Sequence, residues 1–361
     1  MSAMVPITAS SNRDGSAIRT LIVDDSVVVR TVIERILQGH PGFVVAQKSK
    51  MAENALRFLE RDHADLILLD IELPGQSGLA ALPAILRASG GAKVVILSGS
   101  CEEGSAAAVE ALALGASDIL AKPDSGAFGN QFPQMLLDRL GRLFGEQAAG
   151  AISAAPPPLR MAPQRNAAPL GCLGIGASTG GIHALGQLFA GLAAPLGVPI
   201  LVTQHLPVSF TRYFAEQLAR MTTLPVKVAR HGALLAPDTV YVAPGDANLE
   251  CRRGRDGRVN IILNPERTAS GNLPGVDPMF AAMAEAYGPG AAGIILTGMG
   301  RDGLLGARAI VAAGGWIVAQ DQGSSVVWGM PGSAAEAGLT SALLAPEMIM
   351  PFVAQRARAI S

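Results

Sequence analysis

The strongest constraint on the fold of this chain is a regular alternation between short, fully apolar segments and stretches with helical spacing. In the first 144 residues the apolar runs are LIV, VVA, LILL, VVIL and DIL, and the first four lead into segments with helical spacing of apolar residues. Apolar strands that alternate with amphipathic helices form a parallel sheet covered on both faces. The alternation therefore predicts a small doubly wound, flavodoxin-like α/β domain with a five-stranded parallel sheet, closed by a helix near residues 132–144.

Changes in composition mark the expected domain boundaries. Residues 1–17 are polar and aperiodic, and residues 145–169 are dominated by Ala and Pro, which is typical of a linker. We expect a disordered N-terminus (1–17), a first α/β domain (18–144), a linker (145–169) and a second domain (170–361). Strand-like runs resume in the second domain as CLGIG, PILVTQ, TVYVA, VNIIL, GIILT and GWIVAQ, so this domain is predicted to be doubly wound and mostly parallel as well.

One part of the second domain is predicted to leave the parallel sheet. Val240–Val242 and Asn260–Leu263 flank the segment RRGRDGR, in which Asp256-Gly257 is typical of a tight turn. We expect these two runs to pair as an antiparallel hairpin. The four arginines between them are most simply a solvated hairpin tip.

Charge and cysteine content exclude several classes of protein. The chain carries 28 basic and 29 acidic residues, a net charge of −1, which argues against an electrostatic grip on nucleic acid and against a polybasic membrane tether. Three scattered cysteines without a CxxC pair indicate neither a disulfide framework nor a zinc ribbon. Because no apolar run reaches the roughly 18 residues of a membrane helix and no signal peptide precedes the first domain, we expect a cytoplasmic protein without membrane insertion.

Charged and hydroxyl side chains follow the predicted strands of the first domain. Asp24 and Asp25 follow the first strand, Asp70 the third, Ser98 the fourth and Lys122 the fifth. The carboxyl ends of parallel strands meet at one edge of the sheet, and three carboxylates there would repel one another unless a cation such as Mg²⁺ neutralised them. We therefore expect a phosphoryl-binding site in which one aspartate is the acceptor nucleophile, while the lysine and the metal neutralise charge and the serine donates a hydrogen bond.

The segments LIVDDS, LILLDIELPGQSGL, VVILSGS and GASDILAKP resemble a two-component receiver domain. The resemblance implies that Asp70 is the phosphoacceptor and that a histidine kinase is the phosphodonor. It also implies that Asp24, Asp25 and Asp70 hold Mg²⁺, with the backbone carbonyl of Glu72 as a further ligand. One position departs from the pattern, because Ile119 stands where receivers usually place an aromatic switch residue.

A glycine-rich segment of the second domain, LGIGASTGG, contains a candidate nucleophile. A dinucleotide fingerprint lacks its third glycine here, because Thr179 takes that place, and a P-loop lacks its lysine. The intact pattern is Gly176-x-Ser178-x-Gly180, a serine on a strand-to-helix turn, where the helix N-terminus can stabilise an oxyanion. Taken alone this pattern is weak, since a glycine-rich turn with a capping serine is a frequent structural feature.

A serine nucleophile needs a general base, and the base needs an orienting acid. Of the five histidines, His205 directly follows an apolar strand, whereas the others lie near expected turns or on a helix. Asp302 follows another strand, in the loop TGMGRDG. We expect Ser178, His205 and Asp302 to meet at one sheet edge as a triad, in a chain order that differs from that of the α/β-hydrolases.

The segments GIGASTGG, QHLPVSFTRYFAEQLA, VYVAPGD, PGVDPMFAAMA, ILTGMGRDG and AQDQGSSVVWGMPGSAAEAGL resemble the catalytic domain of the CheB protein-glutamate methylesterases. A receiver followed by this domain is that family's architecture. The resemblance implies a triad of Ser178, His205 and Asp302, with the backbone N–H of Met299 as oxyanion donor and no cofactor in the catalytic domain. In two places the sequence departs from the family, because VSF stands where PGF is common and Asn248 where His is frequent.

The function implied is a phosphorylation-activated hydrolase that demethylates glutamate methyl esters, and deamidates glutamines, in methyl-accepting chemoreceptors, giving sensory adaptation. Two alternatives remain open: an output domain that docks on a partner without catalysis, and a serine esterase for small molecules. A DNA-binding output is disfavoured by the near-neutral charge. An open, glycine-lined groove around Ser178 would favour a protein helix as substrate, whereas a deep apolar pocket would favour a small ester.

Overall fold

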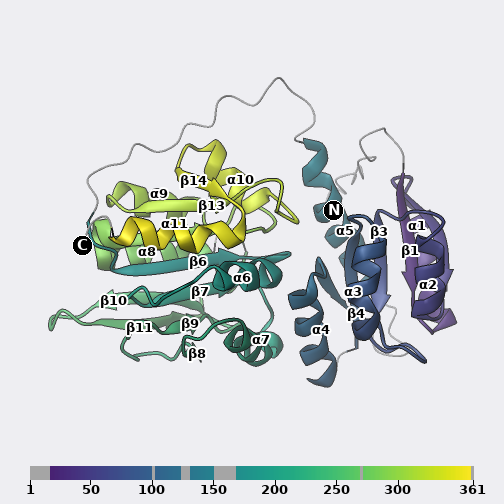
Figure 1. Ribbon diagram of the computed structural model, residues 1–361, viewed down its shortest axis with the longest axis horizontal. Coiled ribbons are helices and arrows are strands. Elements are labelled where there is room, and N and C mark those ends of the chain that lie inside the picture. The colour runs from purple at the N-terminus through teal and green to yellow at the C-terminus, as the bar shows by residue number, and fades with distance from the viewer. Residues whose placement is uncertain (1–16, 100–101, 123–130, 150–167, 269–270, 359–361) are drawn as a thin grey trace, which may run out of the picture. The chain divides into compact units, whose positions relative to one another are not determined.

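The computed structural model describes residues 17–99, 102–122, 131–149, 168–268 and 271–358 (Figure 1). The chain divides into two compact units, residues 1–154 (the first unit) and 155–361 (the second unit). Most of the expected disordered N-terminus and linker, residues 1–16 and 150–167, lies outside the described residues.

The first unit contains a five-stranded sheet in the order β2-β1-β3-β4-β5, and every adjacent pair is parallel. This confirms the predicted doubly wound domain. The strands are β1 (Ile18–Val23), β2 (Phe43–Ser49), β3 (Leu66–Asp70), β4 (Lys93–Ser98) and β5 (Asp118–Ala121). The helices are α1 (Val27–Gln38), α2 (Ala52–Leu59), α3 (Gly78–Ala88), α4 (Glu102–Leu114) and α5 (Gln131–Ala149), the last of which continues beyond the predicted end at residue 144.

The second unit is built on a seven-stranded parallel sheet in the order β14-β13-β12-β6-β7-β9-β8. The strands are β6 (Cys172–Ala177), β7 (Ile200–Gln204), β8 (Val226–Val228), β9 (Val240–Val242), β12 (Ala291–Ile295), β13 (Trp316–Gln320) and β14 (Thr340–Leu344). The helices are α6 (Gly181–Ala190), α7 (Val208–Met221), α8 (Val276–Tyr287), α9 (Leu304–Ala312), α10 (Gly329–Glu336) and α11 (Pro346–Arg358), with a 3₁₀ turn η1 (Gly288–Gly290) after α8.

The side of the sheet on which the chain adds new strands changes at β6. From β6 the chain adds β7, β9 and β8 on one side of the sheet, and then β12, β13 and β14 on the other. In open α/β sheets, ligands bind at the carboxyl ends of the strands where the winding reverses. The second unit therefore has its expected site at the ends of β6, β7 and β12.

The antiparallel hairpin is present, but one of its two predicted strands was wrong. Val259–Asn264 (β11) pairs with Asn248–Arg253 (β10), and Cys251 lies opposite Ile261. Val240–Val242 instead lies in the main sheet, parallel to β7 and β8. The turn explains the difference, because Gly254 N–H donates to the Arg258 carbonyl at 2.8 Å and so pairs the residues that directly flank the turn. The strand β10 was not predicted because its sequence, NLECRR, is mostly polar.

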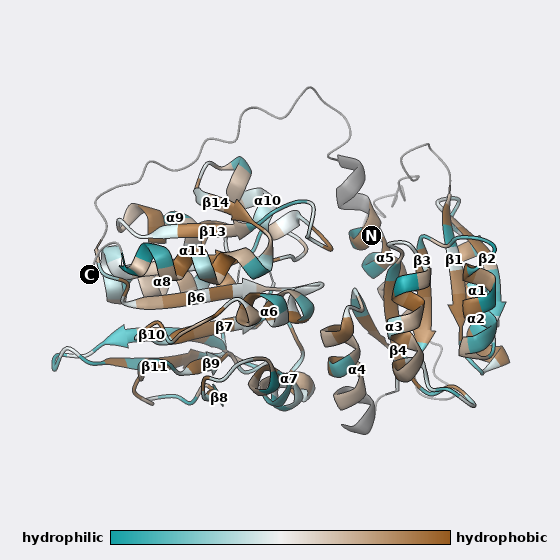
Figure 2. Ribbon diagram, viewed as in Figure 1, coloured by the Kyte–Doolittle hydropathy of each residue, from teal (hydrophilic) through white to brown (hydrophobic). Residues whose placement is uncertain are grey.

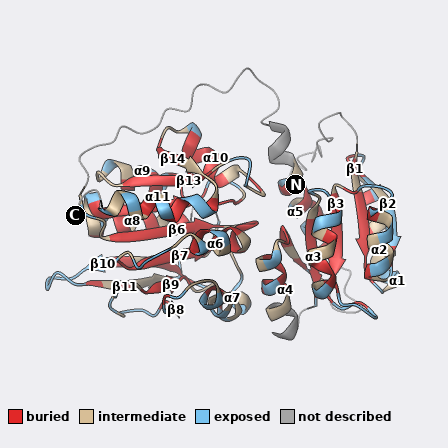
Figure 3. Ribbon diagram, viewed as in Figure 1, coloured by how far each residue is buried: buried red, intermediate tan, exposed pale blue. Residues whose placement is uncertain are grey.

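The core of the second unit lies on both faces of its central strands. Every residue of β6, β7, β12 and β13 is buried, and β6, β7 and β13 are among the buried parts of the unit in Figure 3 and largely apolar in Figure 2. No helix among the described residues is long and apolar enough to cross a membrane.

Helix α8 packs against two glycines of the central strands. Gly174 in β6 and Gly293 in β12 are register partners. A Cβ at Gly174 would lie 2.9 Å from a ring carbon of Phe280, and a Cβ at Gly293 would lie 3.1 Å from the same ring. Phe280 is completely buried, so the missing side chains allow α8 to lie close to the sheet.

We expect Phe280→Ala to lower the free energy of unfolding of the second unit by about 3–5 kcal/mol, because truncation of a buried aromatic ring leaves a cavity. Both tryptophans of the chain, Trp316 and Trp328, lie in this unit, so urea denaturation followed by tryptophan fluorescence reports on it alone. Phe280→Leu is the control and should cost clearly less. A loss below about 1 kcal/mol for Phe280→Ala would contradict this packing.

Candidate functional site

Three of the sequence-predicted residues lie at the carboxyl edge of the central strands in the second unit. Ser178 follows β6, His205 follows β7, and Asp302 lies in the loop after β12. The backbone N–H of His205 donates to the Ala177 carbonyl at 3.1 Å, which continues the pairing of β6 and β7 past the last strand residues. The turn that carries Ser178 therefore lies beside His205.

His205 and Asp302 are directly bonded. His205 Nε2 lies 2.7 Å from Asp302 Oδ2, the Asp302 side chain is fully buried, and the His205 side chain is 15% exposed. Burial raises the pKa of Asp302, but the hydrogen bond and charge of His205, together with backbone N–H groups, outweigh burial and hold the pKa below its ordinary value. An ionised carboxylate thus accepts the Nε2 proton, so Nδ1 is the nitrogen that can take up another proton.

Backbone N–H groups from two segments hold the Asp302 carboxylate. Val276 N–H donates to Oδ2 at 2.8 Å, and the N–H groups of Asp277 and Gly303 each donate to Oδ1 at 3.0 Å. Val276 and Asp277 are the first residues of α8. The positive end of this helix therefore stabilises the buried charge.

Ser178 lies on the turn between β6 and α6. Its N–H donates to the Thr297 carbonyl at 3.1 Å, and its own carbonyl accepts from Gln204 Nε2 at 2.8 Å. Gly180, with φ +75°, makes the turn possible. Gly298 faces the serine so closely that a Cβ there would lie 2.8 Å from the Ser178 Cβ. These contacts leave Ser178 half-buried, with its position fixed from both sides.

The Ser178 hydroxyl makes no hydrogen bond to His205 among the described residues. Catalytic hydrogen bonds are often absent or long in free enzymes and form when substrate binds. The structure therefore joins the acid and the base directly, and it brings the serine to the same edge.

Met299, the predicted oxyanion donor, lies in the loop between β12 and α9. Its neighbours are tied down, because Gly298 N–H donates to the Val327 carbonyl at 3.0 Å and the Gly298 carbonyl accepts from Met330 N–H at 2.9 Å. Within the described residues the Met299 N–H donates to no protein group. Gly298 faces Ser178, so an N–H without a protein partner at the next residue is compatible with the predicted oxyanion donor.

The sequence analysis missed a buried polar network beneath the serine. Thr297 N–H donates to Gln320 Oε1 at 2.8 Å, and the Thr297 hydroxyl donates to the Thr179 carbonyl at 3.0 Å. Both Thr297 and Gln320 are 1% exposed. Each is a single polar residue at the end of an apolar strand, the same signal that identified His205.

The first unit brings its three predicted aspartates together. One carboxylate oxygen each from Asp24, Asp25 and Asp70 lies within 4.8 Å of the others. Lys122 Nζ lies 2.9 Å from Asp24 Oδ2 and 2.6 Å from Asp70 Oδ2. Burial raises the pKa of Asp70 to about 6, and the nearby Asp24 charge adds to the effect, while the Lys122 ammonium opposes it.

This cluster fits a hard divalent cation such as Mg²⁺. Two of its carboxylates are buried and one is exposed. Among the described residues, the Lys122 ammonium pairs with the two buried carboxylates, and the oxygen donors match the ligands that Mg²⁺ prefers. Glu72 lies two residues past β3, where its N–H donates to Asp70 Oδ1 at 3.1 Å. Its carbonyl as a further ligand remains a prediction.

The remaining predicted receiver residues lie on the neighbouring strands. Ser98 is the last residue of β4, and its hydroxyl donates to the Gly99 carbonyl at 3.2 Å. Ile119 lies in β5 opposite Ile96. A serine and a lysine therefore end adjacent strands at the edge where the aspartates gather.

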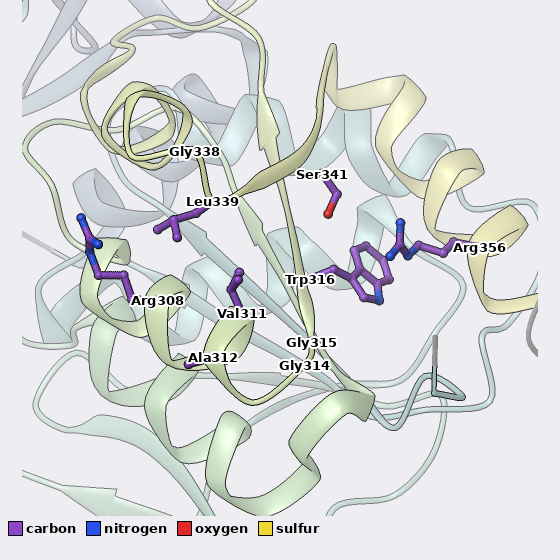
Figure 4. Close-up of a pocket in the computed structure, with 10 residues that line it drawn as sticks. All are labelled: Arg308, Val311, Ala312, Gly314, Gly315, Trp316, Gly338, Leu339, Ser341 and Arg356. Carbon is purple, nitrogen blue, oxygen red and sulfur yellow. The ribbon is translucent and has the colours of Figure 1, made fainter. Parts of the chain in front are cut away.

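A cavity of about 360 Å³ lies at the other edge of the main sheet in the second unit (Figure 4). Its lining includes Trp316 and Ser341, near the beginnings of β13 and β14, and the Arg356 guanidinium lies 4.9 Å from the centre of the Trp316 ring. None of the triad residues lines it. It is therefore separate from the candidate active site.

Together, the fold and the two sites define a response regulator whose second unit carries the features of a serine hydrolase. Comparisons with known proteins agree, since residues 20–127 match the response regulator receiver domain and residues 173–353 match the CheB methylesterase. The chain belongs to the CheB methylesterase family.

Relatives and solved structures extend this similarity over the whole chain. A Caulobacter vibrioides protein named protein-glutamate methylesterase/protein-glutamine glutaminase 2 is 39% identical over 95% of this chain and 100% of its own length. A Paramagnetospirillum magneticum protein with the same name, numbered 1, is 36% identical over 93% of this chain and 95% of its own. The crystal structure of the Thermotoga maritima CheB methylesterase catalytic domain is 34% identical, with a TM-score of 0.50, and covers 52% of this chain and 98% of that one.

We expect the full-length chain to bind Mg²⁺ in isothermal titration calorimetry, and Asp24→Asn to weaken binding by at least about tenfold, because it removes one of the converging carboxylates. Asp138→Asn is the control, since Asp138 lies on α5 and accepts from Gln134. Equal affinities for the wild type and Asp24→Asn would place the metal elsewhere.

Proposed function

We propose that this chain is a phosphorylation-activated serine hydrolase that demethylates glutamate methyl esters, and deamidates glutamines, in methyl-accepting chemoreceptors. The relatives' names state both activities. The observation that carries the proposal is the 2.7 Å bond between His205 and the buried Asp302 carboxylate, at the edge where β6 presents Ser178. We place the activity in the cytoplasm, as part of a chemotaxis adaptation pathway that involves no nucleic acid.

Acylation follows from the geometry of these three residues. His205 Nδ1 accepts the proton of the Ser178 hydroxyl, and Oγ attacks the side-chain carbonyl carbon of a methylated glutamate. The N–H of Met299 stabilises the oxyanion of the tetrahedral intermediate. His205 then gives its proton to the departing methoxy oxygen, and methanol leaves. Asp302 stays ionised and stabilises the imidazolium form of His205 throughout.

Deacylation repeats these steps with water. His205 accepts a proton from water, the hydroxide oxygen attacks the acyl carbon, and Ser178 leaves as its proton returns from His205. The product is glutamate. A glutamine side chain presents the same type of carbonyl, with ammonia as the leaving group in place of methanol, so the same residues serve deamidation.

In the receiver domain, Asp70 is the proposed phosphoacceptor. Its carboxylate attacks the phosphorus atom of a phosphohistidine on the chemotaxis kinase, and the histidine leaves. Lys122 pairs with the charge at this edge, and Ser98 donates a hydrogen bond to the phosphoryl group. Asp24, Asp25 and Asp70 would hold Mg²⁺, and the bound ion would supply positive charge to the phosphoryl site.

Phosphorylation of Asp70 is proposed to raise turnover at Ser178. The phosphoryl group carries about two negative charges and replaces the single charge of the Asp70 carboxylate, so the first unit gains about one negative charge. Such a change can bias a conformational equilibrium between domains. Ile119 stands where receivers usually carry an aromatic switch residue. Activation of the hydrolase by phosphorylation of Asp70 therefore does not use an aromatic ring at this position.

A protein substrate is favoured over a small ester by the names of the relatives, which state a protein-glutamate methylesterase and a protein-glutamine glutaminase. Ser178 is half-buried at the edge of the sheet. A docking output without catalysis would not require the buried acid–base pair.

We expect wild-type protein to release methanol from membranes containing methylated receptors, and Ser178→Ala to reduce the rate by at least about 10⁴-fold, because loss of the nucleophile leaves only binding and oxyanion stabilisation. Ser209→Ala, an exposed serine of α7, is the matched control and should keep the rate. A wild-type protein that releases no methanol, although Asp70 is shown to be phosphorylated, would sink the esterase proposal in favour of a docking output.

We expect a small phosphodonor with Mg²⁺ to raise the rate of methanol release by the wild type, and Asp70→Asn to abolish that increase, because an amide cannot accept the phosphoryl group. Asp138→Asn should respond as the wild type does. An undiminished response of Asp70→Asn would show that activation does not proceed through this residue.

A further inference from the structure

We propose that Asp277 is a positioning residue of the hydrolase site, which acts by fixing the carboxylate of Asp302 against His205. Asp277 lies on α8 in the segment PGVDPMF, and the mechanism above assigns it no role. Its effect on turnover rests on the proposed function, whereas its effect on the reactivity of Ser178 does not.

Helices α8 and α9 exchange their N-terminal caps. The N-cap residues are Gly275 and Gly303, and neither helix has a side-chain cap of its own. Asp302, just before α9, accepts from the first two N–H groups of α8. Asp277, in the first turn of α8, accepts in return from Gly306 N–H of α9, at 2.8 Å. Each aspartate therefore supplies the cap that the other helix lacks.

This exchange sets the place of the catalytic carboxylate. If the first turn of α9 moved away from α8, Asp302 would move with it, because the two segments are adjacent in the chain. The hydrogen bond from Gly306 N–H to Asp277 opposes that movement because it ties the first turn of α9 to α8. Close packing makes the bond possible, since a Cβ on Gly306 would lie 2.7 Å from the Asp277 carbonyl oxygen.

Asp277 also acts on Asp302 through its charge. Burial raises the pKa of Asp277 to about 6, and the Asp302 charge adds to this effect, while the backbone N–H groups of Gly306 and Leu305 oppose it. Among the groups that shift the pKa of Asp277, Asp302 is the charged side chain. Below about pH 6 Asp277 carries a proton and donates it in a hydrogen bond to Asp302, which draws negative charge away from His205.

Three variants of the full-length chain test the role of Asp277. Asp277→Ala removes the bond to Gly306, whereas Asp277→Asn keeps an acceptor for Gly306 N–H and remains neutral at every pH. Asp238→Ala is the matched control, because Asp238 Oδ1 likewise accepts a backbone N–H, that of Gly197 at 2.8 Å, and touches no triad residue. The readouts are methanol release from methylated receptor membranes, the rate of Ser178 labelling by a fluorophosphonate, and the melting temperature.

We expect Asp277→Ala to lower kcat and the labelling rate by about 10- to 100-fold with KM within about twofold, as misplacing a catalytic group does. Asp277→Asn should recover most of the rate, and Asp238→Ala should keep it whatever its change in melting temperature. If Asp277→Ala behaves like Asp238→Ala, or Asp277→Asn is no faster than Asp277→Ala, Asp277 is a cap and nothing more.

The pH profile separates positioning from simple stabilisation. Because Asp277→Asn changes no other ionisable group, the ratio of the wild-type labelling rate to that of Asp277→Asn isolates the charge of Asp277. This ratio should rise by about threefold between pH 5 and pH 8, with its midpoint about pH 6. A flat ratio would overturn the action of the Asp277 charge on Asp302, and because Asp277→Asn keeps the Gly306 bond, this test stands even where Asp277→Ala does not fold.

Failure of the proposed function has a different signature. A wild type that is labelled at Ser178 but releases no methanol would refute the substrate, while the labelling rates of the variants would still decide the role of Asp277. A wild type that is not labelled, while Ser178→Ala behaves identically, would overturn the serine nucleophile and the positioning role together.

Discussion

Both units depend on one constraint, that the strands of a parallel sheet all end at the same edge. In the first unit this brings Asp24, Asp70 and Lys122 into contact from three strands, and in the second it brings His205 to Asp302 across nearly a hundred residues of sequence. The helices determine how the charges gathered there are stabilised.

The two units stabilise buried carboxylates in opposite ways, and the pKa values follow. Asp70 meets one ammonium group and other carboxylates, so burial dominates and its pKa rises to about 6. Asp302 meets a histidine and N–H groups from α8 and its own loop, so its pKa falls despite burial. The first arrangement leaves a demand for positive charge, which suits a metal and a phosphoryl group. The second keeps a permanent anion, which suits an acid that orients a base.

Much of this could be predicted from sequence because the signal is local. A polar residue just after an apolar run marks a strand end, and this signal led to the prediction of Asp70 and His205, whereas Asp302 was predicted from the glycine-rich loop that follows β12. Pairings between distant segments carry no such signal. The partner of β11 was assigned wrongly because NLECRR does not read as a strand, and the exchange of caps between Asp277 and Asp302 joins helices about 25 residues apart. Only the packing of α8 against α9 shows it.

The glycines of LGIGASTGG resolve the competing interpretations of that segment. A nucleotide-binding loop would use its glycines to let phosphates approach the backbone. Here Gly174 makes room for Phe280 and Met283, and Gly176 for Val276, all from α8. The glycines therefore serve to bring the N-terminus of α8 down to the sheet edge, where its N–H groups reach Asp302. The glycines that flank Ser178 therefore also help to hold Asp302, because they let α8, about a hundred residues away in sequence, pack against β6.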